Sequence, residues 1–218
     1  MWILSVPPLR HAASLPGDEL EKQLITCGAQ ALINRQPWDA FRVSPEQISA
    51  HVHAGYDGMN LLLYFEVAEP EIRAVHTGLQ QRVCEDSCVE CFIADEQNDR
   101  YINFEFNPRG ACMAGIGTDR FDRKLLPKDA LRQIQTWSTF GEEGHAACKL
   151  WSLLVRLPLD QFPLFYGRTI LAGLSLPGNF QKCGDLLQHP HYLTWNHIDA
   201  PEPDFHRKEF FGRFVFTQ

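Results

Sequence analysis

Glu90 and Glu105 are spaced so that they could hold a polar ligand together. Glu90 lies in the alternating segment 87–94, a segment that begins directly after Asp86. Glu105 lies in the alternating segment 101–107. If these segments pair as neighbouring strands, both glutamates can point to one face, because side chains alternate along a strand. Carboxylates in that position accept short, directional hydrogen bonds from hydroxyl groups. The alternative is a solvated strand face without a ligand.

Two carboxylates on neighbouring strands could also serve as the acid and base of a glycoside hydrolase. Such enzymes separate the carboxyl groups by about 5–5.5 Å or about 6.5–9.5 Å, according to the stereochemical outcome. The sequence does not show one carboxylate in an apolar setting and the other in water, as that chemistry requires. It also lacks a nucleophile elbow, a zinc-peptidase helix motif and a phosphate loop. A small hydrolase therefore stays an alternative.

Three cysteines match the spacing that binds an iron–sulfur cluster in radical S-adenosylmethionine enzymes. Cys84, Cys88 and Cys91 follow the pattern Cys-x3-Cys-x2-Cys. Cys88 and Cys91 fall inside the alternating segment 87–94, where residues three apart face opposite sides of the sheet. We therefore expect no cluster here.

Histidines offer a second metal hypothesis. His51 and His53 are two residues apart in an alternating segment, and His189 and His191 flank a proline. Two histidines at this spacing can bind zinc, and Cys183 could add a sulfur ligand. A metal-dependent hydrolase using this loop rich in histidine and cysteine is a further alternative. A surface or structural role for these histidines is the simpler interpretation, so the metal stays unknown.

The elements that must position these residues are strands. Period-two alternation and turn residues dominate after residue 40, whereas strand–helix–strand alternation does not recur. The pattern predicts an all-β protein, an antiparallel β-sandwich with one or two short helices, at 18–31 and 128–134. Residues 177–208 are expected to form a long ordered cover. The predicted strands are 47–54, 60–68, 87–94, 101–107, 112–118, 149–157, 169–176 and 210–217.

Composition restricts the partners. The chain has 218 residues, with 20 Lys and Arg against 27 Asp and Glu, and a formal charge of −7. That sign argues against nucleic acid and anionic membranes as partners. No segment of the sequence approaches about 18 consecutive apolar residues, so no membrane span is predicted. Without a visible signal peptide, a cytoplasmic location is expected, although a secreted chain trimmed of its signal would look the same. The seven cysteines are expected to be reduced thiols, many of them buried.

Three blocks, in order, carry a family resemblance. They are residues 83–93 followed by 101–110 (YINFEFNPRG), then 178–185, then 193–196 leading to 203–212. Together they resemble the family 9 carbohydrate-binding modules and related family-9-like domains, most clearly over 35–218. The resemblance implies one jelly-roll-like sandwich over 1–218 that is not catalytic. It also implies a sugar or other small polar ligand held between aromatic walls, and structural calcium.

The resemblance also suggests a set of ligand-binding residues. Trp195 would stack on the sugar ring, and Glu90 would accept hydrogen bonds from hydroxyls. Arg109 and Asn196 would donate hydrogen bonds, with Asp86 and Glu105 alongside.

One position departs from the family pattern. Where sugar-binding members carry a wall tryptophan, six residues before Glu90, this chain has Cys84. A thiol supplies little stacking area for a pyranose. An interaction domain with a vestigial pocket is therefore a third alternative.

Overall fold

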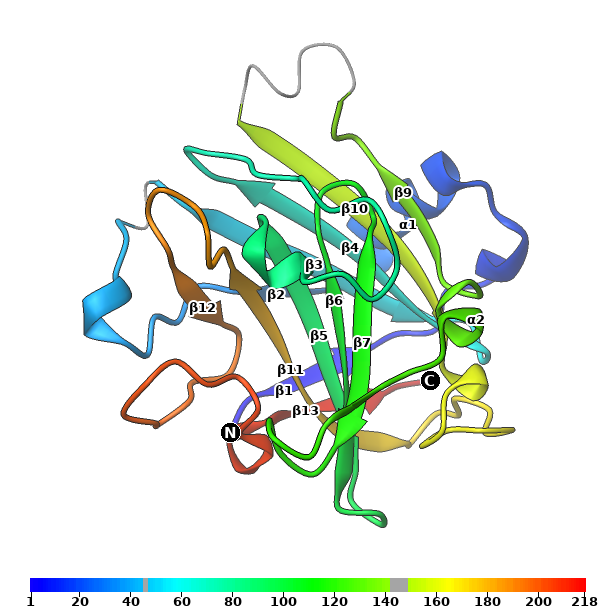
Figure 1. Cartoon of the computed structure of the whole chain (residues 1–218). Helices are drawn as coiled ribbons and strands as arrows, with labels where there is room; N and C mark the ends of the chain where they lie inside the picture. Colours follow the sequence, from blue (N-terminus) through cyan, green and yellow to red (C-terminus); the bar gives the residue numbers. More distant parts are fainter. Residues whose placement is uncertain (45–46, 142–148) are drawn as a thin grey trace.

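Two β-sheets pack face to face in the computed structural model, which describes residues 1–44, 47–141 and 149–218 (Figure 1). The larger sheet has the strand order β1-β13-β11-β5-β6-β7-β8, with β12 added to one edge of β11. Its pairs are antiparallel except β1 with β13, which run parallel. Its strands are β1 (Ile3–Val6), β5 (Cys88–Asp95), β6 (Arg100–Phe106), β7 (Cys112–Gly117), β8 (Lys124–Leu125), β11 (Ser175–Cys183), β12 (Tyr192–Thr194) and β13 (Gly212–Phe216).

The smaller sheet has the order β2-β3-β4-β10-β9 and is antiparallel throughout. Its strands are β2 (Ala29–Leu32), β3 (Ser49–Tyr56), β4 (Asn60–Ala68), β9 (Gln135–Ser138) and β10 (Leu150–Pro158). The prediction of an all-β sandwich is confirmed, with the one parallel pair as an addition. The β3–β4 hairpin and the β5–β6 pair match the predicted segments closely.

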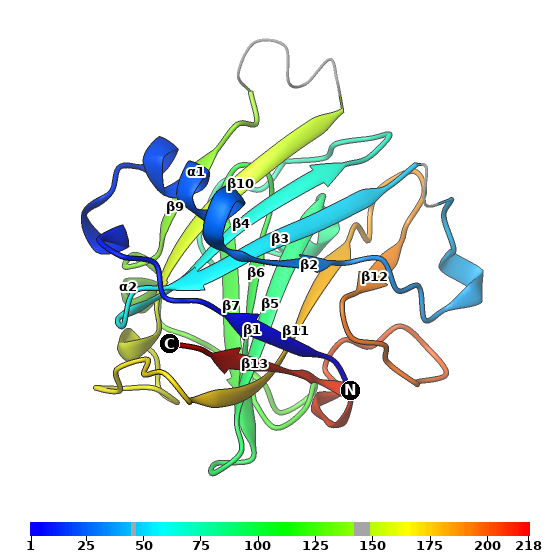
Figure 2. The same ribbon diagram turned by 180° about the vertical axis from the view of Figure 1, so that it is seen from behind.

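Helices are short. Helix α1 (Gly17–Cys27) covers the outer face of the smaller sheet, and α2 (Lys128–Leu131) is a single turn (Figure 2). We predicted a helix reaching residue 31, but it ends at Cys27 because residues 29–32 form strand β2.

The main core lies between the sheets. Alternate residues of β5 and β6, such as Cys91 and Phe104, point into it, and so does Trp151 of β10. A second apolar cluster, which includes Cys88, Phe92 and Tyr101, covers the outer face of the larger sheet. Strand β5 is therefore buried on both faces.

The segment after residue 168 is the main error of the sequence-based prediction. A strand was expected at 169–176 and a long cover at 177–208, but β11 begins only at the end of the expected strand and continues into that cover, and β12 lies within the cover. Pro177 fits β11 because it pairs only with β13, and pairing with β5 begins at Gly178. Proline tolerates such a half-paired position. Strands β1, β2, β8 and β9 were also not predicted.

No helix in the described part of the chain is long and apolar enough to cross a membrane. The six described cysteines form no disulfide, as expected for reduced thiols, and Cys148 lies outside the described residues.

Candidate ligand-binding site

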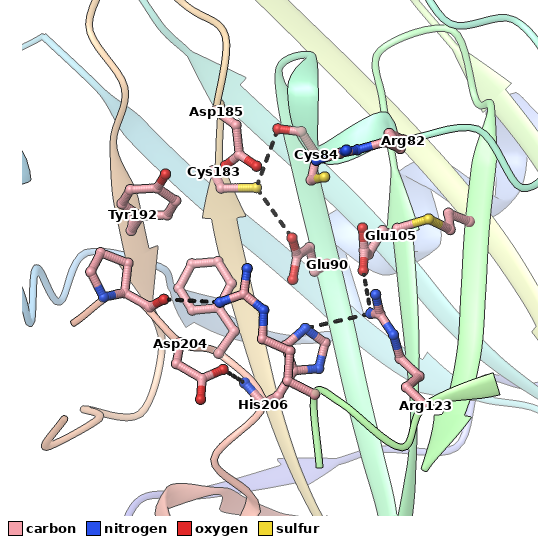
Figure 3. A pocket seen from close by; sticks show the side chains of 14 residues that line it. Arg82, Cys84, Glu90, Glu105, Arg123, Cys183, Asp185, Tyr192, Asp204 and His206 are labelled. Atoms are coloured by element: carbon pink, nitrogen blue, oxygen red, sulfur yellow. Dashed lines mark hydrogen bonds and ion pairs between the residues drawn. The ribbon is translucent and has the colours of Figure 1, made fainter. Parts of the chain in front are cut away.

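A pocket of about 320 Å³ opens on the outer face of the larger sheet, away from the core between the sheets. Strands β5, β6, β7 and β11 form its floor. The segment after β12 and the turn after β7 contribute its walls (Figure 3). Its lining residues are Arg82, Cys84, Glu90, Glu105, Met113, Arg120, Arg123, Cys183, Asp185, Tyr192, Pro203, Asp204, Phe205 and His206.

Glu90 and Glu105 lie side by side at the floor of this pocket. They are direct partners across the β5–β6 pair, and each residue is only 3% exposed. Glu105 Oε1 accepts a hydrogen bond from Asn103 Nδ2 at 2.6 Å and pairs with Arg123 at 3.1 Å. Glu90 Oε1 instead accepts from the Cys183 thiol at 3.2 Å.

The second oxygen of each floor carboxylate is buried without a hydrogen-bond partner among the described residues. These atoms are Glu90 Oε2 and Glu105 Oε2. Burial raises the pKa of Glu90 well above its usual value, and the neighbouring Glu105 raises it further. Burial also raises the pKa of Glu105, although Arg123 opposes the shift. A buried polar atom without a partner is costly, so a ligand that donates hydrogen bonds here would be stabilised.

His206 and Arg123 form the wall beside Glu105. Burial and the nearby Arg123 lower the pKa of His206 to about 3, so its ring is neutral at physiological pH. His206 Nε2 lies 3.4 Å from Arg123, and Nδ1 lies 2.8 Å from the Tyr101 hydroxyl. Because a guanidinium only donates, Nε2 is the acceptor and Nδ1 donates to the tyrosine oxygen.

Aromatic residues form the opposite wall. Tyr192 and Phe205 line the pocket with ring centroids 6.0 Å apart, and Trp38 packs behind Phe205 at 5.8 Å. Asp185 lies between Tyr192 and Cys84, and burial raises the pKa of its carboxyl group. Burial also raises the pKa of Cys84, so this thiol is protonated and offers the pocket a small apolar surface.

Trp195, the residue expected to stack on a sugar, is placed elsewhere. Its indole is 2% exposed and belongs to the main core, stacked on Phe214 at 5.7 Å. The backbone N–H of Trp195 donates to the Phe180 carbonyl at 2.8 Å. The expectation that Trp195 lines the pocket is corrected.

Asn196, which was expected to donate to a ligand, joins chain segments instead. Its Oδ1 accepts from the Trp2 backbone N–H at 2.8 Å, and its Nδ2 donates to the Phe210 carbonyl at 2.6 Å. It is not among the residues that line the pocket.

Arg109 and Asp86 also lie outside the pocket lining. The exposed Arg109 donates to the Ala74 carbonyl at 2.7 Å. Asp86 is fully buried, and its Oδ2 accepts from the backbone N–H groups of Val75 and His76. Both residues fix the segment before β5. Of the six residues that we predicted, the structure brings only Glu90 and Glu105 to this pocket.

The remaining lining residues were not predicted. Arg123 is 18 positions from Glu105, and His206 is 83 positions from Arg123. Arg123 lies outside the blocks that carry the family resemblance, and nothing in its local sequence distinguishes it from other polar loop residues. His206, Asp185 and Cys183 do lie in those blocks, but local sequence did not show that their side chains face a common pocket.

The histidines predicted as zinc ligands do not meet Cys183. His53 contacts Glu66 on the smaller sheet, and His51 lies near Gln30 there. His191 instead accepts from Lys182 Nζ at 2.9 Å.

Among the described residues, one cluster of three potential metal-binding side chains exists, formed by Cys88, Glu90 and Cys183. Calcium, implied by the resemblance, takes six to eight oxygen ligands. This set of two sulfurs and one carboxylate does not fit that ion. The expected separation of Cys88 and Cys91 onto opposite faces is also observed, since they belong to different apolar clusters.

A family model for "Carbohydrate-binding family 9" matches residues 18–216. The chain belongs to carbohydrate-binding family 9. No curated protein matches it in sequence.

Solved structures share this family 9 fold. A Bacteroides uniformis ATCC 8492 protein, provisionally named as carbohydrate-binding, is 30% identical with a TM-score of 0.84, and 98% of each chain is covered. A family 9 module from Caldicellulosiruptor kristjanssonii, solved with glucose, is 12% identical with a TM-score of 0.61, covering 99% of this chain and 95% of that one. A family 9 module from the same organism, solved with cellotriose, is 11% identical with a TM-score of 0.59, covering 99% of this chain and 94% of that one.

Proposed function

We propose that the pocket on β5, β6 and β11 binds a small saccharide, mainly through hydrogen bonds to Glu90 and Glu105. The observation that carries this proposal is the pair of carboxylates Glu90 and Glu105, which both line the pocket and each keep a buried Oε2 atom without a hydrogen-bond partner among the described residues. A sugar presents adjacent hydroxyl groups that can donate to both oxygens at once.

Cationic groups at the pocket support the same proposal. Arg123 is fixed by Glu105, whereas Arg82 and Arg120 are exposed at the rim. Guanidinium groups only donate, so they complement hydroxyl oxygens, while the floor carboxylates accept. Together they satisfy both roles of a sugar hydroxyl.

Phe205 and Tyr192 supply the apolar contact that Trp195 does not. Both rings line the pocket, and the packing of Trp38 against Phe205 holds that wall in place. An aromatic face buries the CH groups of a pyranose. The pocket volume of about 320 Å³ is near the lower end of the roughly 300–1,000 Å³ typical of small-molecule sites. One or two sugar rings fit it better than an extended chain.

Calorimetric titration with glucose and cellobiose tests the proposal. These probes are chosen because family 9 structures from C. kristjanssonii contain glucose and cellotriose. Glu90→Gln keeps the shape of the side chain but turns one of its two oxygens into a donating amide, and a buried hydrogen-bonding group left unsatisfied costs about 1–3 kcal/mol. Kd should therefore rise about 5- to 140-fold.

Glu66→Gln provides a matched control, because that glutamate contacts His53 on the other sheet. Its sugar affinity should equal that of the wild type. If a broad panel of mono- and disaccharides shows no binding, or if Glu90→Gln binds as well as the wild type, the proposal is wrong.

Hydrolysis of a glycoside is the second candidate, favoured by the unequal settings of the two carboxylates. Glu90 contacts a thiol, whereas Glu105 contacts Arg123 and Asn103. Such inequality separates the pKa values of an acid and a base. Turnover of chromogenic glycosides that disappears in Glu90→Gln would establish it, and binding without turnover would exclude it for those substrates.

A further inference from the structure

We propose that Cys88, Cys183 and Glu90 form a binding site for one thiophilic divalent cation, such as Zn²⁺, at the inner end of the pocket. Their three ligand atoms lie within 4.8 Å of one another, and all three residues are buried. This inference does not rest on saccharide binding.

The strand register fixes the three ligands on one face. Cys88 and Glu90 are two residues apart on β5, and Cys183 of β11 is the direct partner of Cys88. Side chains at such positions share a face, and direct cross-strand partners have Cβ atoms about 4.5–5.5 Å apart. The triangle of two sulfurs and one carboxylate is therefore set by rigid backbone.

The observed separations fit tetrahedral coordination. Zn–S bonds of about 2.3 Å and Zn–O bonds of about 2.1 Å place sulfur and oxygen about 3.6 Å apart in a tetrahedron. Glu90 Oε1 lies 3.2 Å from Cys183 Sγ and 4.0 Å from Cys88 Sγ. A cation can therefore enter with small side-chain rotations, and each thiol that binds it releases its proton to solvent.

The ligand types select the cation. Two thiolates favour Zn²⁺, Cd²⁺ and Co²⁺ over Ca²⁺ and Mg²⁺, which prefer oxygen ligands. Three protein ligands leave the fourth position open, as in sites where water or a bound molecule completes the coordination. Because Cys183 and Glu90 line the pocket, a cation held by them would lie at the pocket wall.

Glu90 can serve the cation and a saccharide together. Oε1 is the oxygen beside the thiols, whereas Oε2 has no partner in the described structure. A cation on Oε1 leaves the hydrogen-bonding capacity of Oε2 unused.

Metal titration of the full-length protein tests the site. The protein is first treated with a chelator and a phosphine reductant, and then titrated with Co²⁺ and Cd²⁺ without sugar. Serine at Cys27 and Cys148 in all samples limits uptake by other thiols. We expect one cation per chain, with thiolate-to-metal charge-transfer absorption. Cys88→Ser and Cys183→Ser should each weaken Cd²⁺ binding by more than about tenfold, since even second-shell changes cost about 10- to 100-fold.

Cys91→Ala is the matched control, because Cys91 lies on the opposite face of β5 in the main core. It should retain wild-type uptake. The absence of charge-transfer absorption in the starting protein overturns the proposal even if a variant fails to fold. Cation uptake by both serine variants that equals uptake by the starting protein also overturns the proposal.

Glucose titration of metal-free Cys88→Ser separates the two proposals. Cys88 is not among the pocket-lining residues, so sugar binding should persist where cation binding is lost. If the parent protein takes up the cation but does not bind sugar, only the saccharide proposal is refuted.

Discussion

Replacing Trp195 by alanine should destabilise the protein without weakening ligand binding by its folded form. The indole is 2% exposed and packs in the main core, with ring centroids 5.7 Å from Phe214, 6.0 Å from Phe180 and 6.5 Å from Trp2. It also closely covers Gly212, where an added Cβ would lie 2.5 Å from an indole carbon.

These contacts set the magnitude. Truncation of a buried Trp to Ala in a core costs about 3–5 kcal/mol, and aromatic pairs contribute about 0.5–1.5 kcal/mol each beyond buried area. With three aromatic neighbours, Trp195→Ala should fall in the upper part of that range. The corresponding fall in Tm for a chain of this size is roughly 6–20 °C.

Urea-induced unfolding and glucose calorimetry measure the two effects separately. We expect a lower unfolding midpoint and, below the transition, a sugar Kd close to that of the wild type. Trp137→Ala is a control, since that indole is 37% exposed and its loss should cost much less stability. Unchanged stability with a large loss of affinity would refute the placement of Trp195 in the core.

Three further changes test the framework around the site. Lys182→Met leaves Glu69 buried without the ammonium partner that lies 2.9 Å away, and it should lower the free energy of unfolding by about 3–5 kcal/mol. Adding Glu69→Gln should recover much of that loss. If the effects of the two substitutions in urea unfolding are strictly additive, the pairing is contradicted. His191 has its pKa lowered from 6.5 to about 3 by burial and by Lys182, so folding excludes a proton that the unfolded chain binds. Stability should therefore fall as pH drops from 6.5 toward 3, by up to about 1.4 kcal/mol per pH unit, and His191→Gln should flatten this slope in acid-unfolding curves. Gly178→Ala places a Cβ 2.2 Å from the Phe214 ring and should lower Tm through about 1–3 kcal/mol of overpacking; an unchanged melting curve would contradict this close approach.

Local pattern was sufficient for the central strand pairs. The alternation and short polar turn between β5 and β6 predicted their pairing, and the register places Glu90 directly opposite Glu105. The β4 segment was predicted with its observed bounds, Asn60–Ala68. In both cases the information lies within a few residues of the turn.

Strand β11 could not be predicted in this way, because its stabilising contacts are distant in sequence. Its sequence SLPGNFQKC combines turn residues with polar residues, which locally resembles a loop. Lys182 is fully buried because Glu69, 113 positions away, accepts from it at 2.9 Å. Asn179 similarly bonds to the backbone of Asn196. Long-range pairing therefore overrides the local signal.

The orientation of Trp195 was mispredicted for a related reason. Its polar neighbours Thr194 and Asn196 suggested an exposed loop, but both are buried, and Asn196 bonds to distant backbone. Polar flanking residues therefore do not by themselves place an aromatic side chain in solvent.

The thiol at Cys84 connects the departure from the family pattern to the chemistry of this pocket. The aromatic contact is confined to the wall of Tyr192 and Phe205, whereas Cys84 and Cys183 line the pocket near Glu90. With less stacking area, a larger share of the binding energy must come from the floor carboxylates. Glu90→Gln should therefore weaken saccharide binding more than Phe205→Leu, which keeps an apolar wall. The reverse order would show that aromatic contact, rather than hydrogen bonding to Glu90, dominates recognition in this chain.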